Sequence, residues 1–278
     1  MERLDYSIFY HLSVLTEVLT QTTTVLLLLL VFLALTTFCT SANRFAGVIF
    51  KNLFLSVCGF LIVIFSYKWY YSALANQVSV SSINSQFLAN PFSDVLVILS
   101  LLVTCISWIY LSERYLYKTT SASAYFLIFV VLTINMCFSN NLLTMFIFFE
   151  LLFVPSLFFV YRFGYAKKID KTIHFLLLWT LCGSFLCLTG LVYLYSLTKT
   201  LYLNNLIHCQ FSFYEQTLLF LIFFIGFGVK IPVWPFHYWL TKVHVEAPTG
   251  FSIFLSGFLV KTAFFCLYSF YLLFDQCY

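Results

Sequence analysis

Three ionisable residues lie deep inside strongly apolar stretches of this sequence. Glu150 occurs within MFIFFELLFVPSLFFV, Lys230 within IGFGVKIPVW, and Lys261 within FSIFLSGFLVKTAFF. Ionisable side chains at membrane depth are rare and usually mark an ion or proton path. A carboxylate there is costly unless it is paired, hydrated or protonated. The pattern therefore indicates proton or ion movement through a bundle of membrane helices.

Each of the three residues also has a plainer interpretation. Glu150 would be a neutral, hydrogen-bonded structural side chain, and the two lysines would extend their long side chains to the membrane surface. Further apolar residues follow Lys230, and Lys261 lies eleven residues beyond Gly250 and fourteen before Asp275. Because neither lysine is close to a polar boundary, we predict functional positions, with Lys261 facing the bundle interior.

A break in the helix is predicted directly after Lys230. Residues that precede a proline avoid the α conformation, so Pro232 ends a half-helix there. In lipid, a broken helix is tolerated only where its freed backbone is buried in protein or lines a cavity. Its unpaired carbonyls favour a nearby cation such as Lys230. Pro155 is expected to kink the helix of Glu150 or to free a carbonyl near it.

A polar cluster follows the break and contains His237, His244 and Glu246. Histidine titrates near physiological pH, which suits a proton relay. The same residues could instead satisfy the broken backbone as ordinary loop residues. Their spacing matches no recognised zinc site, so we do not expect a metal there.

Composition sets the fold class. Of 278 residues, 62% are hydrophobic and 9% charged, with a mean hydropathy of +0.98, whereas a soluble domain has about 25% charged residues. This composition predicts an all-α polytopic membrane protein surrounded by lipids. The net charge of +4 is modest, and no basic run indicates a nucleic-acid partner. Most of the nine cysteines lie in apolar runs and no pair has metal-ligand spacing, so they are interpreted as small apolar residues.

Eight apolar runs predict eight transmembrane helices, of which the seventh is discontinuous. They cover approximately residues 25–40, 46–67, 94–111, 124–138, 142–161, 172–196, 215–239 and 250–274. The very short turn at 139–141 makes the fourth and fifth helices an antiparallel hairpin. No conventional signal peptide precedes the first run.

The loops between these helices alternate between two sides of the membrane and differ in charge. One side has three cations, Arg3, Lys68 and Lys199. The other has nine, which by the positive-inside rule face the cytoplasm or matrix: Arg44, Lys51, Arg114, Lys118, Arg162, Lys167, Lys168, Lys171 and Lys242. Both termini are then expected on the opposite side.

The buried residues suggest a mechanism. If Glu150 lies beside Lys230, the lysine keeps its proton, because a nearby negative charge favours the ammonium. If the pair separates, burial favours the neutral amine. The proton can then pass toward Lys261 or His237. We treat this as a hypothesis.

The residues around the break resemble a known family. The stretch KIPVWPFHYWLTKVHVEAPTGFSIFLSGFLVK is similar to the signature region of NADH dehydrogenase subunit 4 of respiratory complex I. The HVEAP element distinguishes subunit 4 from the related antiporter-like subunits 2 and 5. Upstream, FFELLFVPSLFFVYRFG resembles the glutamate helix of that family. The specific part of the resemblance runs from about residue 140 to residue 261.

The resemblance implies an antiporter-like subunit that pumps protons within NADH:ubiquinone oxidoreductase. Glu150 and Lys230 would be its coupled pair, Lys261 the central relay lysine and His237 a relay histidine. Such a subunit carries no flavin, iron–sulfur cluster or quinone site, so no cofactor is expected in this chain. NADH oxidation would take place elsewhere in the complex.

The resemblance also implies an architecture. The family has fourteen helices: three leading ones, two inverted five-helix repeats at helices four to eight and nine to thirteen, and a last helix. Residues 1–120 would hold the leading helices and residues 121–278 the first repeat. A separate chain would supply helices nine to fourteen. Other membrane-arm subunits, including subunits 2 and 5, would be neighbours in the mitochondrial inner membrane, with both termini on the intermembrane-space side.

Two other functions fit part of the sequence. A subunit of a multisubunit sodium/proton antiporter would share the glutamate and lysine pattern, but HVEAP argues against it. A structural remnant would keep the helices without the pumping. The presence of Glu150, Lys230 and Lys261 together argues against that second alternative.

Overall fold

The computed structural model describes residues 56, 58–59, 61–66, 91–114, 119–164, 169–206 and 208–275. In these residues the chain is helical apart from turns and contains no β-strand. The predicted first span, 25–40, lies outside them, as does most of the second, 46–67, of which the described part is helical.

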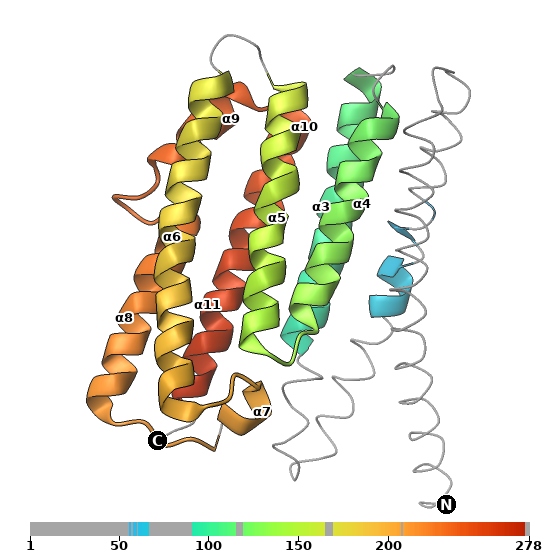
Figure 1. Ribbon diagram of the computed structural model, residues 1–278. Helices are drawn as coiled ribbons and strands as arrows, with labels where there is room; N and C mark the ends of the chain where they lie inside the picture. Colours follow the sequence, from blue (N-terminus) through green and yellow to red (C-terminus); the bar gives the residue numbers. More distant parts are fainter. Residues whose placement is uncertain are drawn as a thin grey trace, which may run out of the picture.

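The other six predicted spans correspond to helices that pack into one bundle (Figure 1). Among the described residues, five helical segments are long and apolar enough to cross a membrane, so the all-α polytopic fold is confirmed. The elements are α3 (Pro91–Arg114), α4 (Thr119–Cys137), α5 (Leu142–Phe163), α6 (Ile169–Thr198), the short α7 (Leu203–Leu206), α8 (Phe213–Lys230), α9 (Tyr238–Glu246), α10 (Thr249–Phe254), the π-helical turn η2 (Leu255–Leu259) and α11 (Val260–Asp275).

Local sequence signals fix where several helices begin. Asn141 caps α5, because its side chain accepts a 2.9 Å hydrogen bond from the Leu143 N–H. Ser212 and Glu215 form a reciprocal capping box at the start of α8, which satisfies backbone donors that an isolated helix start leaves unpaired. Pro91 is the first residue of α3, where its missing N–H is harmless.

The predicted break in the seventh span is present. α8 ends at Lys230, residues 231–237 form turns, and α9 begins at Tyr238. Figure 1 shows α8 along the lower part of the bundle and α9 near its upper end. The irregular segment between them therefore lies at an intermediate depth, next to the position of the lysine.

The last span differs from the single regular helix that the sequence predicts. It consists of α10, the π-helical turn η2 and α11 in direct succession. A π turn adds one residue to a helical turn and shifts the face that later residues present. The side chain of Lys261 donates a hydrogen bond to the Ser256 carbonyl within this irregular turn.

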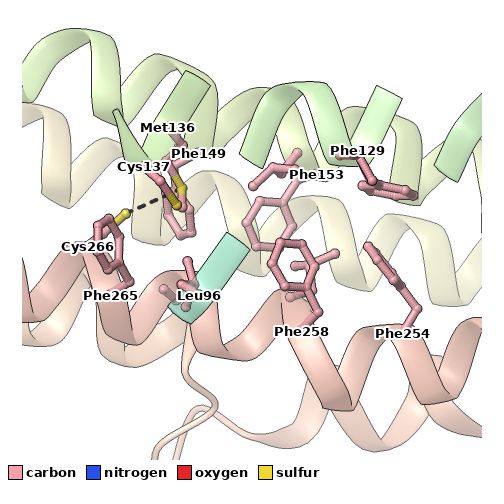
Figure 2. Packing of buried hydrophobic residues seen from close by; sticks show 14 of the residues in the cluster. Leu96, Phe129, Met136, Cys137, Phe149, Phe153, Phe254, Phe258, Phe265 and Cys266 are labelled. Carbon is pink, nitrogen blue, oxygen red and sulfur yellow. Dashed lines mark hydrogen bonds between the residues drawn. The ribbon is translucent and has the colours of Figure 1, made fainter. Parts of the chain in front are cut away.

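Phenylalanine rings fill much of the space between the helices. Phe129 lies 4.6 Å from Phe254 and Phe159 lies 4.6 Å from Phe251, measured between ring centroids. These rings join α4, α5 and α10. Figure 2 shows Phe129, Phe254 and Phe258 packed together with the α5 rings on one buried surface.

Two glycines allow α8 to pack closely on α6, against which it lies. A methyl group at Gly226 would lie 2.6 Å from the Cys187 sulfur, and one at Gly183 would lie 2.8 Å from the Gly226 carbonyl oxygen. No side chain fits at either position without displacing its neighbours. This close crossing fixes the height at which Lys230 leaves α8.

Candidate functional site

The structure brings together two of the residues predicted from sequence. The Lys230 ammonium, at the end of α8, forms an ion pair with Oε1 of Glu150, near the middle of α5. The lysine side chain is fully buried, whereas 27% of the glutamate side chain is exposed. A buried charge needs a partner. In this pair the lysine is shielded from solvent, whereas the glutamate is partly accessible to it.

A serine from a third helix holds the other carboxylate oxygen. The Ser184 hydroxyl, on α6, lies 2.6 Å from Glu150 Oε2 and also 2.6 Å from the Thr180 carbonyl oxygen. A hydroxyl has one hydrogen, so Ser184 donates to only one of these acceptors at a time. Donation to the carboxylate is a charge-assisted hydrogen bond, stronger than one between neutral groups.

Groups beyond the break donate hydrogen bonds to carbonyl oxygens at the end of the half-helix α8. The Val233 N–H lies 3.0 Å from the Gly228 carbonyl oxygen. The buried Trp239 indole Nε1 donates to the Val229 carbonyl oxygen at 2.7 Å. The negative end of a helix dipole attracts a cation, so the end of α8 adds to the attraction of Glu150 for Lys230.

Two aromatic rings complete the surroundings of the lysine. Lys230 Nζ lies 4.4 Å from the ring centroid of Phe149 and 4.6 Å from that of Phe153. Both rings are buried and come from α5, the helix that carries Glu150. The ammonium therefore has a carboxylate and two aromatic rings as neighbours.

The two prolines flank this arrangement. Pro155 is buried inside α5, which continues through it as a helix to Phe163. Because proline has no N–H, the Leu151 carbonyl lacks its usual donor one turn later. Pro232 follows the end of α8, as the sequence predicts.

The polar cluster lies beyond the break from the ion pair. His237 is exposed and directly precedes α9, His244 is half-buried in its last turn, and Glu246 is its last residue. Burial lowers the pKa of His244 below its usual value, since burial disfavours the charged imidazolium. In the part of the chain that the structure describes, no three histidine, cysteine or acidic side chains lie close enough to hold a metal ion.

The position of Lys261 corrects one prediction. Its side chain is exposed on α11 and donates to the Ser256 carbonyl, so in this chain it does not face the bundle interior. The interior side of the same turn is taken by buried Thr262 and Ala263. The sequence argument located Lys261 far from both ends of its span, but distance along a helix does not determine which side faces inward.

Sequence reasoning missed Ser184, Phe149 and Phe153 as neighbours of the ion pair. The phenylalanines cannot be distinguished from other apolar residues by type. The small residues Gly183 and Gly226 carried a usable signal, because such residues permit close helix crossings. A hydroxyl next to a close crossing, such as Ser184, is a candidate partner for an ion pair at the same depth.

Comparison with known proteins supplies a family and relatives. Residues 139–278 match the family described as NADH:quinone oxidoreductase/Mrp antiporter, TM. NADH-ubiquinone oxidoreductase chain 4 of Paramecium tetraurelia is 36% identical over 183 residues, which cover 66% of this chain and 39% of the relative. NADH-quinone oxidoreductase subunit M of Rickettsia bellii is 37% identical over 125 residues, 44% of this chain and 25% of the relative. The chain therefore spans well under two thirds of the length of these relatives.

Solved structures share the fold. A chain of the Mrp complex from a Dietzia species superposes with a TM-score of 0.75 at 16% identity, covering 92% of this chain and 49% of that one. A chain of respiratory complex I from Thermus thermophilus with bound NADH gives a TM-score of 0.56 at 19% identity, covering 84% of this chain and 53% of that one. At these identities the likeness establishes the helical architecture alone.

Proposed function

This chain belongs to the NADH:quinone oxidoreductase/Mrp antiporter transmembrane family, and we propose that it is a proton-translocating subunit of a complex I-type NADH:quinone oxidoreductase. The observation that carries the proposal is the buried ion pair between Glu150 and Lys230 at the end of a half-helix. The names of the curated relatives, chain 4 and subunit M, support the same assignment.

The ion pair supplies an element with two charge states. With Glu150 ionised beside it, Lys230 keeps its proton, because a neighbouring negative charge favours the ammonium. When Glu150 is protonated or moves away, burial disfavours the charge on Lys230. Because the glutamate is partly exposed and the lysine is fully buried, Glu150 is the member of the pair through which protons and neighbouring charges act.

The released proton moves toward Lys261 or His237 in this proposal. His237 directly precedes α9 and Lys261 lies on α11, and both can accept and return a proton. His244 and Glu246, on α9, are secondary candidates. Redox chemistry takes place elsewhere in the complex, and this chain contributes helices and titratable side chains rather than a redox centre.

A separate chain carries the remaining helices in this proposal. Support comes from the exposed side of α11, where Lys261, Phe264 and Tyr268 are uncovered. A lysine facing lipid is unfavourable, so further helices are needed there. Neighbouring membrane-arm subunits, among them antiporter-like subunits 2 and 5, adjoin this assembly in the mitochondrial inner membrane, with both termini on the intermembrane-space side.

The proposal is tested by proton pumping in the intact complex. Sealed vesicles holding the complex with Lys230→Ala or Glu150→Gln should oxidise NADH while taking up far fewer protons per NADH than the parent. Normal pumping by both variants would overturn the proposal. Mass spectrometry of the native complex tests the companion chain, because a short chain carrying the remaining helices should migrate with this one.

A second candidate is a subunit of a multisubunit cation/proton antiporter. Its support is the family matched over residues 139–278, whose description names Mrp antiporters beside NADH:quinone oxidoreductases. Isolation of this chain in a small complex without NADH oxidation, together with sodium-dependent proton exchange, would favour the second candidate.

A further inference from the structure

The Lys230 ammonium has an unusual set of neighbours for a buried charge. One side faces the Glu150 carboxylate, with which it forms the ion pair. Phe149 and Phe153 place their rings against it at 4.4 and 4.6 Å from the ring centroids. An aromatic face carries negative charge density and attracts a cation, and this attraction is greater where water is excluded.

The remaining groups near Lys230 cannot replace the carboxylate. The titratable side chains that interact with it electrostatically are Glu150 on α5, Cys187 on α6 and Cys266 on α11. The two cysteines are fully buried, and thiols in apolar surroundings stay uncharged. If Glu150 loses its charge, the aromatic rings are the strongest remaining attraction for the ammonium among these neighbours.

The rings are held in place by their own packing. Phe149 meets Phe153 edge-on at 5.5 Å between centroids and lies 5.5 Å from Phe227 of α8. They are four residues apart on α5, so both project from the same side of that helix. Figure 2 shows the two rings adjacent to one another within the buried core. Such fixed rings cannot follow Glu150 if the carboxylate moves.

We propose that Phe149 and Phe153 form an aromatic cage that holds the Lys230 ammonium in place and delays its loss of a proton when Glu150 is protonated or withdrawn. This inference rests on the proposed function and deepens it. With the cage, the lysine releases its proton less readily than it would if the carboxylate were its only stabilising neighbour. Loss of the ion pair still favours release of the proton, and the cage makes that release slower or shifts it to higher pH.

The cage is tested by the pH dependence of pumping in the intact complex. Phe149→Leu, Phe153→Leu and the double variant remove the aromatic faces but keep apolar bulk. In sealed vesicles we expect the alkaline limb of proton uptake per NADH to move to lower pH, by about one pH unit for the double variant. Phe153→Tyr retains a ring and should keep the parent profile.

A matched control comes from the same helix. Phe159 is buried on α5 and stacks on Phe251. Phe159→Leu removes a similar volume without removing a ring from the lysine, so its pH profile should stay with the parent's. Should the leucine variants fail to assemble, Phe153→Met fills the space more adaptably and is expected to shift the profile in the same direction.

The outcomes separate this inference from the proposed function. If Glu150→Gln abolishes pumping while the double leucine variant keeps the parent pH profile, the cage is wrong and the proposed function stands. The cage is also wrong if Phe159→Leu shifts the profile as much as Phe153→Leu. If Glu150→Gln and Lys230→Ala both pump normally, the proposed function itself fails.

Discussion

The indole of Trp239 spans the break in the seventh membrane helix and donates to the Val229 carbonyl oxygen at 2.7 Å. Val229 directly precedes Lys230, so the indole fixes the backbone from which the buried lysine projects. The two residues belong to α8 and α9, and their hydrogen bond holds the halves of the discontinuous helix together at the ion pair.

Replacing Trp239 with phenylalanine should loosen this connection. The variant keeps most of the aromatic bulk but leaves the Val229 carbonyl without its indole donor, at a cost of about 1–3 kcal/mol. We expect a lower melting temperature of the purified complex and reduced proton uptake per NADH. Trp234 is 80% exposed in the turn between the half-helices, so Trp234→Phe is the control. Equal melting temperatures for both variants would contradict this role of the hydrogen bond.

Removal of the Ser184 hydroxyl should leave the Glu150 carboxylate without a hydrogen bond that holds it in place. Its 2.6 Å hydrogen bond to Glu150 Oε2 involves a charged acceptor, and such bonds contribute about 1.5–3 kcal/mol. Ser184→Ala is therefore expected to slow proton pumping by about tenfold or more, with assembly unchanged, while Ser184→Thr retains a donor and pumps close to the parent rate. Ser196→Ala, at an exposed position of α6, is the control. Parent-like pumping by Ser184→Ala would exclude a role for this contact.

The crossing of α6 and α8 should tolerate no side chain at Gly226. A methyl group there would lie 2.6 Å from the Cys187 sulfur and 3.1 Å from its backbone nitrogen. Gly226→Ala must push α8 away from α6, which should destabilise the complex by about 1–3 kcal/mol and weaken the ion pair through Lys230. Thermal unfolding and pumping measure the two effects.

Gly228 offers a control within the same helical turn. A methyl group there would meet its nearest atom, in Val233, only at 4.0 Å. Gly228→Ala should therefore leave unfolding and pumping close to the parent. If both alanine variants lose stability and pumping alike, the close crossing at Gly226 is not the cause, because alanine favours the helix more than glycine does.

Much of the fold could be predicted from sequence because lipid imposes simple constraints. Apolar length predicted the six described spans, and Pro232 predicted the end of α8 to within two residues. The pairing of Glu150 with Lys230 was a conditional hypothesis from their chemistry and an implication of the family resemblance, and the structure shows the ion pair. The membrane side on which each loop lies stays a prediction.

Other features depend on packing that the sequence does not display. The π-helical turn at 255–259 contains no proline, and the sequence did not predict it; such a turn shifts the face that later residues present. Ser184 and the two phenylalanines of the cage become neighbours of the ion pair only because α5, α6 and α8 meet at one depth. Side-chain periodicity within one helix does not specify the rotation of another.

His244 should make the stability of the folded chain depend on pH. Burial lowers its pKa below the usual value near 6.5. Between the folded and the unfolded pKa, the unfolded chain therefore binds more protons than the folded chain. The stabilisation is fully present above about pH 6.5 and is lost as the pH falls through the lowered folded pKa. The melting temperature of the parent should drop on acidification by more than that of His244→Gln. The same pH slope in both proteins would contradict this assignment.

The exposed side of α11 carries a lysine where a membrane helix would ordinarily be apolar. Lys261 is exposed there, near the exposed aromatic residues Phe264 and Tyr268. Its contact with the Ser256 carbonyl satisfies one of three ammonium hydrogens. An exposed ammonium at membrane depth requires water or polar groups from other helices.

Amine labelling distinguishes a covered from an uncovered lysine. In the isolated chain in detergent, a membrane-permeable acylating reagent should modify Lys261 and leave the buried Lys230 unmodified, as measured by mass spectrometry of the fragments. In the native assembly, Lys261 should be protected severalfold, because the proposed additional helices cover it. Lys199, exposed after α6, reports reagent access in the isolated chain. If Lys261 reacts equally in both states while Lys199 confirms access, no helices cover this side of α11, and the exposed lysine faces water or lipid headgroups instead.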